Sequence, residues 1–281
     1  MRLGIVLVSM ALPAFSLNLE FLTEKPPDLK TIIERSVEAG AKDWKVKPTY
    51  DCLERDVEVG GSTKTYEDRM IDGSPYQRLV EVDGKALSPD EAREEQRKLD
   101  ETISRRRNES EHQRQQRIAK YEKDRRRNHL MMEQLTKAFD FTLDGEQRLD
   151  GHQVYVLKAR PRPGYRPPNM ETEALRGMQG QLWIDEKTFE WVKVEARVVH
   201  PVSIEGFLAR VEPGTQFELE RKPVEDGIWL PSHFTMKSRA KVFFLFPQSS
   251  QEDDMYYGYH KSGTAPVTSH ASRWGTGTDI R

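Results

Sequence analysis

The chain has 281 residues, of which 32% are charged, with 44 Lys and Arg against 46 Asp and Glu. The formal net charge of −2 lacks the basic excess that nucleic-acid binding needs, so no nucleic-acid partner is expected. The single cysteine, Cys52, excludes an intrachain disulfide and a zinc site built from several cysteines. Cys52 lies in a predicted strand, where we expect it to be a small buried hydrophobe.

The first sixteen residues have the layout of a secretory signal peptide. Arg2 supplies positive charge, residues 3–12 form a short apolar run, and Ala14 and Ser16 are small residues at the −3 and −1 positions. We therefore expect cleavage after Ser16 and export. The alternatives are a buried N-terminal strand or an uncleaved anchor. A transmembrane helix needs about 20 apolar residues, and no later segment has them, so no transmembrane span is expected.

Residues 17–262 are predicted to form one domain, followed by a polar tail over 263–281. Apolar residues at helical spacing predict a short helix over 29–39, which Gly40 ends. Gly145 is expected to end a later strand. Strands are predicted over 50–59, 64–71, 76–82, 139–143, 154–159, 182–184, 191–198, 207–211, 215–221 and 255–260.

A charged helical insertion is predicted over residues 88–139. Ser88 can cap its start, Pro89 suits the first helical position, and Glu91 can complete a capping box. We expect one long helix, or two helices with a break near residues 108–110.

Two arginine runs lie within this insertion, at residues 105–107 and 125–127. Carboxylates surround both runs, so a mixed, solvated helix face is the first interpretation. The alternative is peripheral membrane contact, because basic clusters are attracted to anionic lipid head groups.

The clearest pattern in the chain is an alternation of apolar and polar residues over 228–246, which predicts one long strand with a dry face and a wet face. The polar face carries Lys237, Arg239 and Lys241. The dry face has two interpretations, either a wall of an ordinary core or the lining of a cavity for a lipid. The candidate lipid-binding residues on it are Ile228, Leu230, Phe234, Met236, Val242, Phe244 and Phe246.

No motif indicates catalysis. The seven histidines are scattered without the spacing of a metal-binding helix, and the chain has no P-loop, nucleophile elbow or dinucleotide fingerprint. We therefore expect a protein that is not an enzyme and has neither a metal site nor a cofactor.

The segments over 180–198, GQLWIDEKTFEWVKVEARV, and 78–88, RLVEVDGKALS, resemble the periplasmic lipoprotein carrier (LolA-like) superfamily, which includes the outer-membrane lipoprotein-sorting proteins. The resemblance implies a mainly β fold with helices (α+β). Its strongly curved antiparallel sheet forms an unclosed half-barrel, with an N-terminal helix and, here, the long charged helical insertion. It also implies a periplasmic location.

Two functions follow from these observations. The first is an exported, non-enzymatic protein that binds lipid or lipoprotein acyl chains on a concave apolar sheet face. The alternative is a structural or sensor module of the same fold that binds a protein partner without a lipid cavity.

Overall fold

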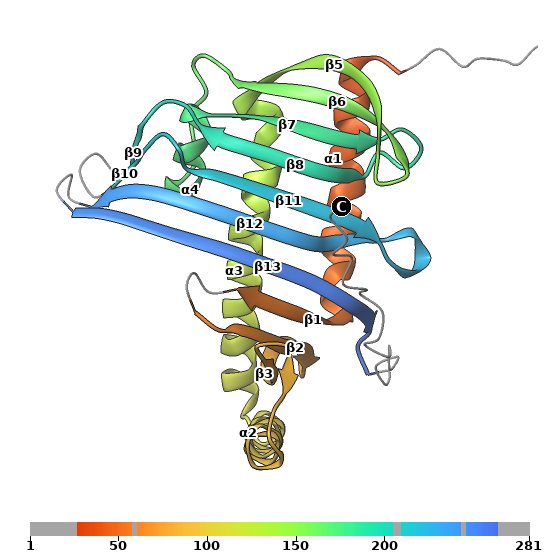
Figure 1. The fold of residues 1–281 in the computed structure, drawn as a ribbon, viewed down its shortest axis with the longest axis vertical. Coiled ribbons are helices and arrows are strands. Elements are labelled where there is room, and N and C mark those ends of the chain that lie inside the picture. The colour runs from red at the N-terminus through yellow and green to blue at the C-terminus, as the bar shows by residue number, and fades with distance from the viewer. Residues whose placement is uncertain (1–26, 58–60, 205–208, 243–245, 264–281) are drawn as a thin grey trace, which may run out of the picture.

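A single antiparallel sheet dominates the computed structural model, which describes residues 27–57, 61–204, 209–242 and 246–263 (Figure 1). Its main path runs β4-β3-β2-β1-β13-β12-β11-β8-β7-β6-β5, and β10 joins β9 to β12. The strands are β1 (Tyr50–Val57), β2 (Thr63–Ile71), β3 (Ser74–Val82), β4 (Lys85–Ala86), β5 (Phe139–Leu149), β6 (His152–Pro161), β7 (Met178–Asp185), β8 (Trp191–Val198), β9 (Val202–Ile204), β10 (Ala209–Val211), β11 (Gln216–Pro223), β12 (Trp229–Val242) and β13 (Phe246–Lys261).

The sheet is open, because β4 and β5 end its path and do not pair with each other in the part of the chain that the structure describes. The helices are α1 (Leu29–Val46), α2 (Pro89–Arg107), α3 (Glu111–Ala138) and the single turn α4 (Met170–Glu173). Helices α1 and α3 lie on the same side of the sheet (Figure 1). The expected class, an open antiparallel sheet with an N-terminal helix and a long helical insertion, is confirmed.

The register of the strands defines an inner and an outer face, since directly opposed residues point to the same side of a sheet. One such row runs across five strands as Leu157, Leu182, Val194, Leu219 and Phe234. The first three are buried in a core that also contains Ile32 of α1 and Ala138 of α3. This is therefore the inner face, covered by the helices.

Next to this row the outer face carries polar residues, and further along the same strands it carries the buried pair Val156 and Trp183. Opposed positions there hold Lys158, Gln181, Glu195, Glu218 and Thr235. The predicted division of the strand after residue 228 into a dry and a wet face is confirmed for its described middle part, because Phe234 lies on the inner face and Thr235 on the outer face.

The long strand predicted over 228–246 is wrong at its C-terminal end. Strand β12 ends at Val242, and Phe246 begins β13, where it pairs back onto Val242. The residues between them are two phenylalanines and a leucine, without the Gly, Pro, Asn or Asp that usually mark a turn. The apolar residues therefore continue without a break through the chain reversal, which is why the sequence pattern did not reveal it.

Helix α1 is longer than predicted, because Gly40 does not end it. Asp28 caps its start through a hydrogen bond from the Thr31 amide, and the helix continues to Val46. A glycine inside a helix costs only about 1 kcal/mol relative to alanine. The contacts that Asp43 and Trp44 make beyond Gly40, described below, outweigh that cost.

The structure also differs from the sequence prediction at two β-bulges. Gly145 does not end its strand; it lies at a bulge, where the register with β6 shifts between Leu143 and Gly145, and β5 continues to Leu149. A second register shift lies opposite Glu220 and Arg221 in β12. Each bulge adds one residue to a strand, which a period-two pattern does not reveal.

The insertion forms two helices that meet at a sharp corner. This confirms the second of the two expectations, a break near residues 108–110. Ser88 and Glu91 form the predicted capping box of α2, and Ser110 and Gln113 form a second one at the start of α3. The chain turns between them at residues 108–110. Figure 1 shows α2 at one end of the molecule, beneath β2 and β3.

The tip of the β2–β3 hairpin is held in this corner. Asp72 and Gly73 both have positive φ, of 46° and 85°, which suits a tight two-residue turn. A side chain at Gly73 would meet Ile118 of α3, since a Cβ built there lies 2.9 Å from its Cδ1. The glycine therefore permits both the turn and the close approach of the helix.

Candidate functional site

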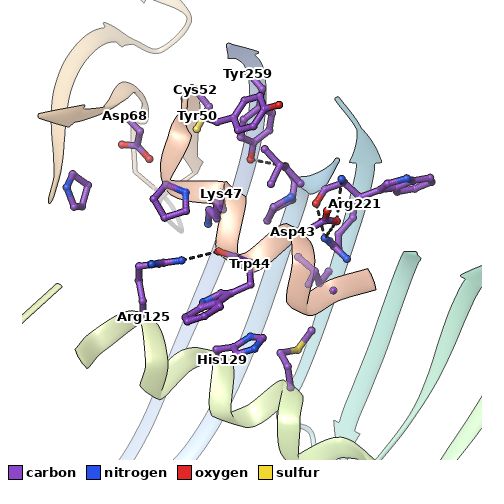
Figure 2. A pocket seen from close by; sticks show the side chains of 18 of the residues that line it. Asp43, Trp44, Lys47, Tyr50, Cys52, Asp68, Arg125, His129, Arg221 and Tyr259 are labelled. Atoms are coloured by element: carbon purple, nitrogen blue, oxygen red, sulfur yellow. Dashed lines mark hydrogen bonds and ion pairs between the residues drawn. The ribbon is translucent and has the colours of Figure 1, made fainter. Parts of the chain in front are cut away.

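A cavity of about 920 Å³ lies between α1, α3 and the strands from β3 to β8 along the sheet path, and we call it the main cavity (Figure 2). Seven aromatic residues line it: Trp44, Tyr50, Tyr76, Tyr121, Trp191, Trp229 and Tyr259. Its aliphatic wall includes Val37, Leu219, Leu230, Met70 and Met132. A largely apolar wall of this kind, with a few polar groups, is typical of sites for small hydrophobic ligands.

The wall between the two helices is held together by Trp44 of α1. Arg125 of α3 donates a hydrogen bond to the Trp44 carbonyl oxygen at 2.6 Å, and its guanidinium lies 4.5 Å from the centre of the Trp44 ring. His129, one turn later, stacks on the same ring with centroids 4.3 Å apart and planes 11° apart. Burial lowers the pKa of His129, and nearby Arg125 adds to this effect. Figure 2 shows all three side chains at the junction of the helices.

A buried ion-pair cluster fastens α1 to the sheet on the other side of the cavity. The Arg221 guanidinium lies 2.8 Å from Asp43 Oδ2 and 3.2 Å from Glu190 Oε2, and these side chains are 9%, 2% and 6% exposed. The Trp229 amide also donates to Asp43, and Arg221 donates to the Trp229 carbonyl. Burial raises the pKa of Glu190 to about 7, Arg221 opposes this, and the neighbouring Asp43 reinforces it.

Acidic and tyrosine side chains gather where the main cavity meets β1, β2 and β13. Burial, and then the charge of Asp68, raise the pKa of Glu54 to about 7, and burial also raises the pKa of Asp68. Burial likewise raises the pKa values of Tyr256 and Tyr259. With a pKa near 7, Glu54 is partly neutral at physiological pH, which reduces the negative charge of this wall.

Cys52 is buried, as the sequence predicted, and it lies beside Tyr259. It is a free thiol in the wall of the main cavity, and burial raises its pKa to about 12. Since the thiolate is the reactive form, this cysteine is suited to a structural role.

The proposed lipid-binding residues have different positions. Leu230 lines the main cavity and is 2% exposed, and Ile228 packs with Tyr50 and Leu230 next to it. Phe234 and Met236 are half-buried on the inner face, opposite Leu219 and Phe217, beyond the wall of the cavity. Phe244 and the side chains of Val242 and Phe246 lie outside the described residues, as do the proposed signal peptide and most of the tail.

Sequence reasoning missed the helical side of the cavity. Trp44 was overlooked because the helix was expected to end at Gly40, and Tyr121 and His129 because their helix is so polar. A signal was present in the spacing of Tyr121, Arg125 and His129, which are four residues apart and therefore share one helix face.

The arginine runs are partly used inside the molecule. Arg106 is 7% exposed and donates to the carbonyl oxygens of Ile71, Ser74 and Pro75 at 2.7, 2.8 and 3.0 Å. Arg125 closes the cavity wall described above. These contacts favour a structural role for the central arginine of the first run and the first arginine of the second.

Two histidine–aspartate pairs lie outside the main cavity. His152 is 3.0 Å from Asp185, and His233 is 2.8 Å from Asp253. No Ser, Thr or Cys side chain hydrogen-bonds to either imidazole within the described ranges. Asp185 also accepts hydrogen bonds from the amides of Lys187 and Thr188, which indicates that it organises the turn after β7.

The residues that the structure describes contain no group of three or more His, Cys, Asp and Glu side chains placed to hold a metal ion. Among their helices, none combines the length and the apolar character needed to cross a membrane.

Comparison with known proteins gives matches among solved structures only; neither a protein-family model nor a curated protein sequence matches. A LolA superfamily protein from Nitrosomonas europaea is 10% identical, with 84% of this chain and 94% of that chain covered and a TM-score of 0.30. An outer membrane lipoprotein-sorting protein domain from Vibrio parahaemolyticus is 11% identical, with 84% and 95% covered and a TM-score of 0.32.

A third match is MucB in complex with MucA, which is 14% identical, with 84% of this chain and 100% of that chain covered and a TM-score of 0.23. The fold itself rests on the strand pairing described above.

Proposed function

We propose that the chain is an exported, non-enzymatic binding protein that holds a lipid, or the acyl chain of a lipidated partner, in the main cavity. The observation that carries the proposal is the cavity of about 920 Å³ with the seven aromatic residues that line it. Sites for small apolar ligands commonly measure about 300–1,000 Å³.

The construction of the cavity supports this function. The Arg125–Trp44 contact and the Asp43–Arg221 pair hold α1 on either side of the space, so the helix spans the cavity without filling it. The proposed binding surface continues from Leu230 along the inner face to Phe234 and Met236. The alternative, a module that binds a protein without a lipid cavity, is favoured less because it does not require this space.

Gly40 offers a direct test of the proposal. It lines the main cavity, and a Cβ built on it has no atom within 4 Å. Gly40→Phe should therefore fill the cavity without displacing the backbone, and Gly40→Ala is the matched control.

We expect mass spectrometry of organic extracts to find lipid with the wild type and Gly40→Ala and much less with Gly40→Phe. A wild type free of lipid, or equal amounts in all three proteins, would reject the function. Intact-mass measurement of the exported protein tests the location separately, since a mass that retains residues 1–16 would contradict export with cleavage after Ser16.

A further inference from the structure

A second hollow, of about 830 Å³, lies between the first turns of α1, the end of α3 and β5, and we call it the side cavity. Its apolar wall is formed by Leu29, Ile33, Val37 and Phe141. It is close in volume to the main cavity, and it too falls in the range of about 300–1,000 Å³ that encloses a small ligand.

The two cavities share one wall residue, Val37 of α1. Residues four apart lie on the same face of a helix, and Ile33, Val37 and Ala41 follow one another at that spacing. Ile33 lines the side cavity, Ala41 lines the main cavity, and Val37 lines both. The two cavities therefore meet along this face of α1 at the half-buried Val37, and we call this place the seam.

From this arrangement we infer that the ligand is a lipid with two acyl chains, one in each cavity, whose branch point lies beside Val37. The inference rests on the proposed function and goes beyond it by naming the class of lipid. A single acyl chain would occupy one cavity and leave the other without an occupant, whereas a two-chain lipid places apolar groups against both walls.

The charges at the rim of the side cavity indicate the head group. Lys30 lies 3.7 Å from Glu34, with 81% and 62% of their side chains exposed, and Arg162 lies 2.7 Å from Asp140, with 43% and 58% exposed. Glu38 adds a further carboxylate. Such exposed ion pairs contribute little to the stability of the fold. Their positive and negative side chains can therefore reorient to contact a ligand. A zwitterionic head, with a phosphate and an amine, complements this rim better than an anionic one.

The test uses delipidated full-length protein and three probes: oleate, a dioleoyl phosphatidylethanolamine and a dioleoyl phosphatidylglycerol. Native mass spectrometry measures the binding of each. The wild type should bind all three, with the phosphatidylethanolamine at least tenfold tighter than oleate and tighter than the phosphatidylglycerol. Val37→Trp should block the seam, so its affinity for the two-chain lipids should fall at least tenfold more than its affinity for oleate.

Val37→Ala is the matched control; it keeps the seam open, so the ratio of its affinities for two-chain lipid and oleate should match that of the wild type. Ile33→Trp fills the side cavity away from the seam and should repeat the effect of Val37→Trp. If one of the two variants does not fold, the other still tests the inference. If both tryptophan variants bind the two-chain lipids as tightly as the wild type does, the inference is overturned, as it is by a wild type that binds oleate alone. A stronger preference for phosphatidylglycerol would overturn the head-group assignment. Failure to bind any of the probes would reject the proposed function itself.

Discussion

The Arg125 guanidinium of α3 binds the Trp44 residue of α1 in two ways, by a 2.6 Å hydrogen bond to its carbonyl oxygen and by a position 4.5 Å from the centre of its ring. The last four carbonyls of a helix have no partner within the helix, and Trp44 lies in the final turn of α1. A cation at this end also interacts favourably with the helix dipole. One side chain therefore satisfies a free carbonyl and joins the two helices that enclose the main cavity.

Replacing Arg125 should separate the two helices. A hydrogen bond to a charged donor contributes about 1.5–3 kcal/mol and an exposed cation–π contact about 0.5–1 kcal/mol. We expect Arg125→Ala to lower the free energy of unfolding by about 2–3 kcal/mol in urea denaturation. Arg126→Ala, at the neighbouring exposed position, should change it by no more than about 0.5 kcal/mol. Equal effects of the two substitutions would contradict the role given to Arg125.

The Glu190 carboxyl makes stability depend on pH. Its pKa is raised from an ordinary value of 4.5 to about 7, so the folded state favours the protonated form. The resulting stabilisation is complete below about pH 4.5 and is lost as the pH rises through 7. At about 1.4 kcal/mol for each pKa unit, the loss is on the order of 3 kcal/mol.

Glu190→Gln keeps the shape of the side chain without its ionisation. We expect the free energy of unfolding to fall less between pH 5 and pH 9 in this variant than in the wild type. Glu38→Gln, at an exposed position, should leave the pH profile unchanged. A wild-type profile that rises over this range would show that the sign assigned to Glu190 is wrong.

Arg106 should determine the stability of the corner between α2 and α3. Arg106→Ala leaves three carbonyls of the β2–β3 hairpin without their donor, at a cost of about 3 kcal/mol or more, because each such bond to a charged group contributes about 1.5–3 kcal/mol. Opening should be local. Hydrogen exchange should therefore accelerate in α2 and the hairpin, and remain slow in β6 to β8. The exposed Arg107 supplies the control, and an equal effect of Arg107→Ala would count against this account.

Regular local patterns explain why much of the fold was predictable. The boundaries of β8 matched the prediction, and so did the Ser88 cap, because each depends on residues close in sequence. The sequence prediction was wrong at Gly40, at Gly145 and at the reversal after Val242, because nearby residues do not determine the structure there. At Gly40, contacts of Asp43 and Trp44 with distant segments decide the structure, and neither the bulge nor the reversal interrupts the apolar pattern.

Less of the candidate site than of the fold could be predicted from the sequence. Leu230 could be found from the alternation of β12, because strand periodicity shows which residues share a face. The main cavity depends instead on the distance at which α1 and α3 cross the sheet. That distance is set by pairs such as Arg221 and Asp43, which are 178 residues apart in sequence.

A charge on the inner face of β12 should be more harmful than one on its outer face. Met236 is half-buried on the inner face, and it lies opposite Phe217 of β11 and Glu252 of β13. Met236→Glu would place a carboxylate beside Glu252, and like charges directly opposite destabilise a sheet. Partial desolvation adds to this cost, so we expect the free energy of unfolding to fall by about 2 kcal/mol.

Lys237→Glu is the control on the outer face. Lys237 is exposed and lies opposite Gln216 and Gln251, so reversing its charge should change the free energy of unfolding by only about 0.5 kcal/mol. Urea denaturation of both variants measures the difference, and lipid content is measured on the same samples. Loss of lipid from a folded Met236→Glu protein would extend the binding surface along β12 as proposed. If Lys237→Glu proves the more destabilising of the two, then the faces of the strand have been assigned the wrong way round, because burial and charge would then act on the opposite side of the sheet.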